Sequence, residues 1–311
     1  MTTKIPTTQL TLAALASLTS AASATLVIHE PFAYADTGPS DGVAFLGDGS
    51  QGGGLGLSPW RQANSRGDNT NEIEVSVPGL DFTDTSGNSL VSSGGHAVRT
   101  ERVGQNSISS DLTVAAASAL ATDNSTMWMS FLYVDNGFSG PDSAIAIASQ
   151  DMVAADSQNL AAMGFGVGVD ISFSAGIGTA VYNGGTSASI VREATPSFND
   201  GGSNSFLSSD VFLLAAKINW NPDGTPDEIF VFNITDLTSE PAEGDALASD
   251  TFEMSAANQA LLDTLTIGET QIDGFDEVRV GTSFQSVVPI PEPSSLALAA
   301  LGGLMLVRRR R

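Results

Sequence analysis

Short segments in which apolar residues alternate with polar residues or glycine are the feature that most restricts the fold of this chain. Between residues 163 and 173 the apolar side chains share one parity, and three glycines with Asp170 share the other. Glu72–Val77 alternates in the same way. Successive side chains of a strand point to opposite faces, so both segments predict strands rather than helices.

Strand-like segments recur along the chain, and turns rich in glycine, asparagine and aspartate separate them. Further strands are expected at Thr126–Val134, Val211–Asn219, Glu228–Ile234 and Gln271–Val280. Many short strands with such turns indicate an all-β sandwich or barrel, and the length suits one domain. The three glycines on one strand face also predict the close approach of another layer or a strongly bent sheet.

Helices are expected at only two places. Leu112–Ala121 can form a helical turn. Ser255 is a suitable N-cap for a short helix over Ala256–Leu265, with Leu261 and Leu262 pointing inward.

Charge and cysteine content restrict the possible partners. None of the 311 residues is a cysteine, which excludes disulfides and thiolate metal sites. The net charge is −23, and between residues 25 and 289 seven bases and 34 acids give 7 − 34 = −27. Such a surface repels nucleic acid and anionic membranes, so no nucleic-acid partner is expected.

Met1–Ala24 has the three parts of a secretory signal peptide. Lys4 supplies a positive start, an apolar run of small residues begins at Leu10, and Ala22-Ser23-Ala24 is a cleavage motif. Export by the secretion machinery is therefore expected, with a mature chain that begins at Thr25.

The C-terminal residues combine a proline motif, a short apolar segment and a basic cluster. Pro291, Glu292 and Pro293 precede the apolar run Ser294–Val307, and the chain ends on Arg308, Arg309, Arg310 and Arg311. In this order they resemble the PEP-CTERM sorting signal of Gram-negative bacteria. The resemblance implies cleavage by an exosortase, a membrane enzyme, after transient anchoring in the inner membrane. The arginines would hold the end of the chain on the cytoplasmic side.

The region between the two ends resembles the concanavalin/LamG-like domains that accompany such tails. Four segments carry the resemblance: His29–Tyr34, Gly52–Trp60, Trp128–Leu132 and Asp276–Thr282. It implies a jelly-roll β-sandwich of two antiparallel sheets over residues 25–286, between a signal peptide (1–24) and a sorting tail (287–311). The expected location is the cell surface or the extracellular matrix.

Paired carboxylates are the most serious option for enzymatic chemistry. Glu72 and Glu74 lie two residues apart on one strand face, so their carboxyls can reach the separation of about 5–9.5 Å that glycosidases use. The glycosidases most like this fold carry a denser pattern of acids, so no catalytic residue and no enzyme are expected. The adjacent pairs Asp227-Glu228 and Asp276-Glu277 are expected at solvated strand edges.

Metal binding, if it occurs, is expected at the turn between residues 221 and 228. The two histidines, His29 and His96, form no zinc motif. Calcium accepts oxygen ligands from irregular loops. The candidate Ca²⁺ ligands are Asn221, Asp223, Asp227 and Glu228. A hairpin turn without metal is the alternative.

Tryptophans are the candidates for stacking on sugar rings. Trp128 lies in an apolar segment and is expected in the core, whereas Trp60 and Trp220 adjoin loops and are the candidate glycan-binding residues. The leading hypothesis is a non-catalytic surface or matrix protein with weak binding of extracellular polysaccharide. A hydrolase or lyase that uses Glu72 and Glu74, and a matrix protein without a ligand, are the alternatives.

Overall fold

The computed structural model describes residues 24–34, 44–46, 52–66, 73–92, 94–99, 105–120, 122–134, 143–150, 163–169, 177–183, 189–193, 211–269 and 274–288. The expected signal peptide up to residue 23, the sorting tail from residue 289 and Glu72 lie outside these residues. No helix in the described part combines the length and the apolar character that crossing a membrane requires.

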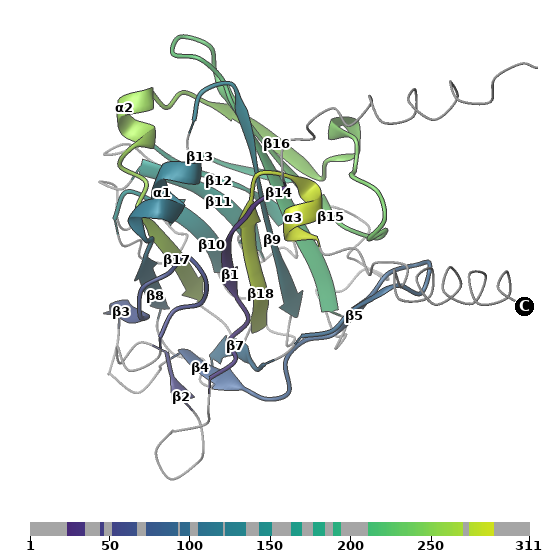
Figure 1. Ribbon diagram of the computed structural model, residues 1–311. Helices are drawn as coiled ribbons and strands as arrows, with labels where there is room; N and C mark the ends of the chain where they lie inside the picture. Colours follow the sequence, from purple (N-terminus) through teal and green to yellow (C-terminus); the bar gives the residue numbers. More distant parts are fainter. Residues whose placement is uncertain are drawn as a thin grey trace, which may run out of the picture.

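The larger sheet contains nine of the described strands (Figure 1). Their order is β16-β15-β14-β9-β18-β7-β4-β2, and β1 pairs with β18 off this path. These strands are β1 (Leu26–Glu30), β2 (Ala44–Phe45), β4 (Ile73–Ser76), β7 (His96–Arg99), β9 (Ser125–Val134), β14 (Val211–Trp220), β15 (Asp227–Asn233), β16 (Ala248–Phe252) and β18 (Gly274–Gly281).

The smaller sheet contains seven described strands in the order β13-β12-β11-β10-β17-β8-β3. They are β3 (Arg61–Arg66), β8 (Gln105–Asp111), β10 (Ser143–Ala148), β11 (Met163–Val169), β12 (Ile177–Asn183), β13 (Ser189–Glu193) and β17 (Thr264–Glu269). The strand pairs in both sheets are antiparallel. The two sheets form the expected all-β sandwich.

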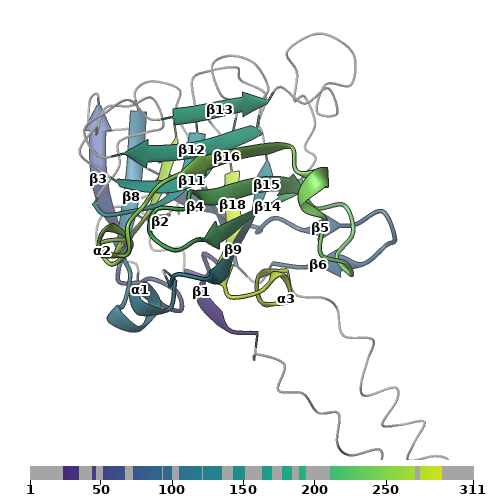
Figure 2. The ribbon, with the colours of Figure 1, turned by 90° about the horizontal axis from the view of Figure 1, so that it is seen from above.

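Helices are few and short, as expected. Within the described residues the helices are α1 (Val114–Leu120), α2 (Ala256–Gln259), α3 (Phe284–Val287) and the 3₁₀ turn η3 (Glu243–Asp245). A small hairpin joins β5 (Phe82–Thr83) to β6 (Ser89–Leu90). Figure 2 shows α1, the start of β1 and α3 on one side of the sandwich.

The main core lies between the two sheets. Phe165 of β11 packs against Trp220 of β14 and Phe252 of β16, with ring centroids 5.4 and 6.1 Å away. Alternate residues of each inner strand face point into this cluster, as the period of two predicts. Burying these apolar side chains is the main stabilising contribution to the sandwich, at roughly 25 cal/mol per Å².

A second apolar cluster covers the outer face of the larger sheet. Trp128 packs against Phe232 and against Phe284 of α3, with centroids 5.8 and 5.2 Å away. Val287 and Val288 are fully buried, and the Ser130 hydroxyl donates to the Val287 carbonyl at 2.7 Å. The folded domain therefore extends to residue 288. The expected boundary at 286 is wrong because the last two valines complete this cluster.

The glycines of β11 permit close approach, but the neighbour is a strand of the same sheet. A Cβ atom on Gly166 would lie 2.1 Å from the carbonyl oxygen of Ile145, and one on Gly164 would lie 2.4 Å from that of Ile147. Both carbonyls belong to β10, which pairs with β11. The glycine row thus lets two strands of one sheet pack closely.

Helix α2 is shorter than the sequence predicts. It ends at Gln259, and β17 begins at Thr264, because the following residues join the smaller sheet. Ser255 is the N-cap but its side chain forms no cap bond, and the carboxylate of Asp223 instead accepts from the Ala256 amide at 2.9 Å. Leu262 is buried as expected, but Leu261 is 51% exposed.

Candidate binding site

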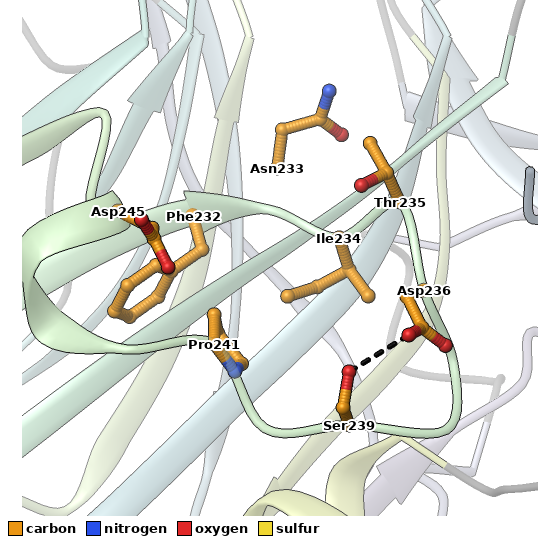
Figure 3. Close-up of a pocket in the computed structure, with 8 residues that line it drawn as sticks. All are labelled: Phe232, Asn233, Ile234, Thr235, Asp236, Ser239, Pro241 and Asp245. Carbon is orange, nitrogen blue, oxygen red and sulfur yellow. Dashed lines mark hydrogen bonds between the residues drawn. The ribbon is translucent and has the colours of Figure 1, made fainter.

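An open pocket lies where β15 ends (Figure 3). Its volume is about 320 Å³, within the size range of small-ligand sites. We call it the β15 pocket, and its lining residues are Phe232, Asn233, Ile234, Thr235, Asp236, Ser239, Pro241 and Asp245.

A tight turn shapes one wall of the β15 pocket. The Asp236 carboxylate accepts from the Thr238 amide at 2.8 Å, the Thr238 hydroxyl at 2.6 Å and the Ser239 hydroxyl at 2.8 Å. These bonds, first those from Thr238, lower the pKa of Asp236 and keep the carboxylate ionised at neutral pH. The turn reverses the chain and brings Pro241 and Asp245 back to the pocket (Figure 3).

The β5–β6 hairpin holds this turn in place. The Asp84 carboxylate accepts from the Leu237 amide at 3.0 Å. It also accepts from the amides of Ser86 and Asn88 in its own hairpin turn. Leu237 is fully buried in the outer cluster. The wall of the pocket is therefore fastened to two separate parts of the chain before any ligand binds.

Several polar groups of the pocket are left without partners. The carboxamide of Asn233, the hydroxyl of Thr235 and the carboxylate of Asp245 form no hydrogen bond within the described part of the chain. A carboxamide offers both donors and acceptors. Beside these groups, Pro241 supplies apolar surface, while Phe232 and Ile234 are buried beneath the pocket. The pocket can therefore bind a ligand that has hydroxyl groups and an apolar face.

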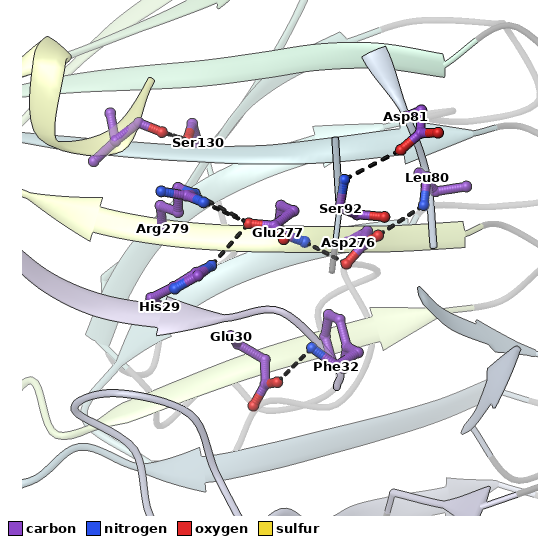
Figure 4. A network of polar contacts seen from close by, with 11 residues as sticks. His29, Glu30, Phe32, Leu80, Asp81, Ser92, Ser130, Asp276, Glu277 and Arg279 are labelled. Carbon is purple, nitrogen blue, oxygen red and sulfur yellow. Dashed lines mark hydrogen bonds and ion pairs between the residues drawn. The ribbon is translucent and has the colours of Figure 1, made fainter. Parts of the chain in front are cut away.

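A second group of carboxylates is closed off inside the domain (Figure 4). Glu30 of β1 is fully buried and accepts four hydrogen bonds. They come from the amides of Phe32 at 2.7 Å and Gly54 at 3.0 Å, the Tyr34 hydroxyl at 2.5 Å and the Trp60 indole at 2.8 Å. Desolvation nevertheless raises the pKa of Glu30. This residue ties β1 to the segment before β3.

A bulge in β18 carries the next two carboxylates. The pairing with β9 shifts register between Asp276 and Arg279, and Glu277 has a positive φ of 50°. The Glu277 carboxylate bonds the His29 ring at 2.8 Å and Arg279 at 2.7 Å. Burial raises the pKa of Glu277, but its bonds with His29 and Arg279 outweigh that effect and lower the pKa.

Asp276 is the most strongly perturbed group of the bulge. It is fully buried and accepts from the amides of Leu80 at 2.8 Å and Glu277 at 2.7 Å. Desolvation prevails over these bonds and raises the pKa of Asp276 to about 8. The expectation that Asp276 and Glu277 lie at a solvated strand edge is therefore wrong. The bulge turns both side chains into the interior, where they fasten β18 to its neighbours.

The two tryptophans expected to bind a glycan are core residues. Trp60 and Trp220 are fully buried, as is Trp128. The Trp60 indole donates to Glu30, and the Trp220 indole donates to the Leu120 carbonyl at 2.9 Å. A buried ring has no face for a sugar, so the prediction for Trp60 and Trp220 is wrong. Only the expectation that Trp128 lies in the core is confirmed.

The turn between residues 221 and 228 uses its acidic side chains to hold itself together. Asp227 is buried and accepts from the amides of Asn221 at 2.8 Å and Met254 at 3.0 Å. Asp223 bonds α2, and Glu228 bonds the Asn219 carboxamide at 3.2 Å. No group of three or more acids or histidines among the described residues is arranged to hold a metal ion. Calcium at this turn stays a prediction that the geometry does not favour.

The carboxylate pair expected for catalysis is only half described. Glu74 lies on β4 and is nearly buried, while Glu72 lies outside the described residues. His96 bonds the Pro78 carbonyl at 2.9 Å, and His29 belongs to the buried network. Catalysis by the pair Glu72 and Glu74 therefore stays a prediction.

The sequence interpretation missed the β15 pocket. One pattern could have indicated it: a dense run of asparagine, threonine, aspartate and serine, Asn233–Ser239, directly after a strongly alternating strand. Loops at strand ends often carry binding residues. The pocket also needs Pro241 and Asp245, and only the folded turn brings them to the strand end.

Comparison with known families identifies the end of the chain. The chain is a β-sandwich protein with a sorting motif at its C-terminus. Residues 289–311 match the PEP-CTERM protein-sorting motif. This motif implies export and sorting to the cell surface, as expected from Pro291, Glu292, Pro293 and the terminal arginines. No curated protein matches the chain.

Similar solved structures concern the sandwich. They include botulinum neurotoxin type C, described as interacting with two ganglioside molecules (TM-score 0.35, 10% identity, 73% of this chain and 51% of that chain). Lectin UEA-II complexed with galactose has a TM-score of 0.34 and 12% identity. The match covers 67% of this chain and 95% of that chain. Alginate lyase Aly36B in complex with an alginate tetrasaccharide has a TM-score of 0.32 and 10% identity. The match covers 72% of this chain and 85% of that chain. The chain spans about half the length of the neurotoxin chains that it matches.

Proposed function

We propose that the mature protein works at the cell surface or in the extracellular matrix as a non-catalytic binder of a neutral glycan. The observation that carries this proposal is the β15 pocket, in which the polar groups of Thr235 and Asp245 have no partner in the described chain. A preformed pocket with unpaired polar groups beside apolar surface is suited to a polyhydroxylated ligand.

The charge of the pocket selects the class of glycan. Its lining includes two acids, Asp236 and Asp245, and no basic residue. Sugar hydroxyls can donate to these carboxylates, and the Asn233 carboxamide can both donate and accept. A polyuronate would bring its own carboxylates against them, in a protein that is already strongly acidic. A neutral polysaccharide is therefore the proposed ligand.

The absence of catalysis is supported by the state of the carboxylates. A general acid in glycoside cleavage needs a raised pKa, whereas hydrogen bonds lower the pKa of Asp236 in the pocket. The carboxyls with a raised pKa, Glu30, Asp227 and Asp276, are all buried and accept hydrogen bonds from backbone amides. The proposal is therefore a binding module, and a hydrolase or lyase based on Glu72 and Glu74 is its competitor.

The route to the surface completes the proposal. The signal peptide takes the chain to the secretion machinery, and the tail tethers it in the inner membrane for a time. An exosortase then removes the tail. The PEP-CTERM motif at 289–311 supports this order of events.

Glycan binding by the mature protein isolated from cells tests the proposal. We expect an array of neutral and acidic polysaccharides to give signal only for neutral ones, and to keep it when EGTA removes calcium. Asp245→Asn should weaken binding about tenfold or more, since it removes a hydrogen-bond partner of the ligand. Asn233→Ala should have a smaller effect, because its carboxamide points away from Pro241 and Asp245 (Figure 3). Glu253→Gln, which removes an exposed carboxylate outside the pocket, should have no effect.

Three results would contradict the proposal. Binding that Asn233→Ala and Asp245→Asn leave unchanged would exclude the β15 pocket. No binding signal for any glycan on the array would favour a matrix protein without a ligand. Turnover of a polysaccharide that Glu74→Gln abolishes would establish the enzyme instead.

A further inference from the structure

One side of this acidic protein carries no charge over five separate segments of the chain. They are residues 24–28, 52–60, 112–120, 254–262 and 281–288, and none contains Asp, Glu, Lys, Arg or His. The rest of the domain carries all of its 34 acids. If the acids were spread evenly along the domain, segments of this total length would contain several of them.

Backbone hydrogen bonds join the five segments into one surface. The Thr282 amide bonds the Thr25 carbonyl at 3.1 Å, and His29, next to the first segment, exchanges two bonds with Leu55 at 3.1 and 2.9 Å. The Thr113 amide bonds the Gly56 carbonyl at 2.9 Å. The Leu112 amide bonds the carbonyl of Asp263, which directly follows the fourth segment, at 2.7 Å. We call this surface the uncharged face.

Glycine makes one of these junctions possible. Gly56 has a φ of +79°, and a Cβ atom there would lie 2.4 Å from the Val27 carbonyl and 3.3 Å from the Ala116 side chain. The loop between β1 and β3 therefore packs directly onto both β1 and α1. The uncharged face is a fixed part of the sandwich.

The uncharged face exposes large apolar side chains. Val114 at the start of α1 is 85% exposed, Leu55 is 57% exposed and Leu261 is 51% exposed. Around them, the exposed residues of α1 and α2 are mostly alanine: Ala115, Ala119, Ala256, Ala257 and Ala260. Three acids adjoin the uncharged face: Asp111 pairs with Arg61 at 2.8 Å, Asp263 bonds the Thr264 hydroxyl at 2.9 Å, and Asp223 accepts from the Ala256 amide at the start of α2 at 2.9 Å.

Both ends of the folded domain lie on this same side. β1 begins there, between α1 and α3, and α3 ends there (Figure 2). The last buried residue, Val288, stands six positions before Ser294, where the apolar run begins, so an extended chain between them spans at most about 22 Å. A domain held by its tail would therefore present this side to the bilayer at close range.

We propose that the uncharged face rests on the lipid bilayer while the sorting tail is still attached. Exposed apolar side chains on a helix can enter the boundary between headgroups and acyl chains. The acids elsewhere would be repelled by anionic headgroups, and their absence from this face removes that barrier. This inference rests on the membrane tethering proposed above.

Site-specific fluorescence on the full chain tests the proposal. Because the chain has no cysteine, Val114→Cys, Leu261→Cys and Ser86→Cys each create a single labelling site. Ser86 lies in the exposed turn of the β5–β6 hairpin, away from α1 and α2 in both views (Figures 1 and 2). The labelled full chain is reconstituted in vesicles of phosphatidylethanolamine and phosphatidylglycerol that carry a spin-labelled lipid. Quenching of an environment-sensitive label is then measured.

We expect the label at 114 and at 261 to be quenched at least about fivefold more than the label at 86, since only the uncharged face reaches the lipid. Val114→Glu should reduce quenching at 261, and Ser86→Glu should leave it unchanged. Val114 is almost fully exposed, so neither change creates a cavity.

The outcomes separate this inference from the tethering on which it rests. A full chain that does not float with the vesicles would overturn both. A chain that floats while the label at 114 remains unquenched would overturn only the lipid contact. Disulfide formation between two copies at Val114→Cys, without quenching, would show that a second copy covers this face.

Discussion

The buried carboxylate network and the β15 pocket use the same residue types for opposite purposes. In the network, Glu30, Asp276 and Glu277 are surrounded by donors and closed to solvent. In the pocket, Asp245 lines an open volume of about 320 Å³ and has no partner in the described chain. The comparison teaches that the partners of a carboxylate, more than its presence, separate a structural role from a binding role.

The largest expected effect of a substitution comes from Glu30→Ala. It leaves the amides of Phe32 and Gly54, the Tyr34 hydroxyl and the Trp60 indole without their acceptor in a buried site. We expect the free energy of unfolding in urea to fall by about 3–5 kcal/mol. Glu253→Ala, at an exposed position, should change it by less than about 0.5 kcal/mol. Equal effects of the two variants would break the comparison.

Asp276 should make stability depend on pH. Its pKa of about 8 in the folded state lies above the ordinary value of 3.8, so the folded protein binds the proton more tightly than the unfolded chain. This contribution to stability is complete below pH 3.8 and is lost as pH rises through 8. We expect a loss of up to about 6 kcal/mol over that range, because the two pKa values differ by about four units and each unit is worth about 1.4 kcal/mol.

Urea unfolding at a series of pH values measures this loss. Asp276→Asn cannot titrate, so most of the slope between pH 4 and 8 should disappear in that variant. Asp236→Asn, in the pocket, should retain the slope, because its pKa is lowered and it titrates below this range. A slope that Asp276→Asn leaves unchanged would show that another group is responsible.

His29→Ala should have an intermediate effect. It removes one partner of Glu277, but Arg279 still pairs with that carboxylate at 2.7 Å. We expect a loss of about 1–2 kcal/mol in the free energy of unfolding. Gln285→Ala, on the exposed side of α3, serves as the control. No loss for His29→Ala would mean that Arg279 alone satisfies the buried carboxylate.

The smallest effect on stability is expected in the pocket. Asp245→Ala removes an exposed carboxylate without a partner in the described chain. The melting temperature should stay within a degree or two of the parent protein, since such surface changes cost less than about 0.5 kcal/mol. Thermal unfolding followed by circular dichroism measures it. A large destabilisation would show that Asp245 has a structural role like that of Glu30, and the contrast between the two regions would be lost.

The strands were predictable because their information is local. β9, β14 and β15 begin and end within one or two residues of the expected segments, since alternation and turn residues act between near neighbours. Side-chain roles were less predictable. Trp60 and Trp220 adjoin loops in the sequence, yet segments distant in the sequence bury both rings. The Trp60 indole also donates a hydrogen bond to Glu30.

The sequence by itself determined the β class, the strand segments and the sorting address, because each depends on a short contiguous pattern. Only the tertiary structure decided which carboxylates are buried. The bulge at Asp276 and Glu277 turns two consecutive acids inward. Strict alternation would place their side chains on opposite faces, so the local pattern does not predict this arrangement. The β15 pocket and the uncharged face likewise arise where separate segments meet, and such contacts depend on how the whole chain packs.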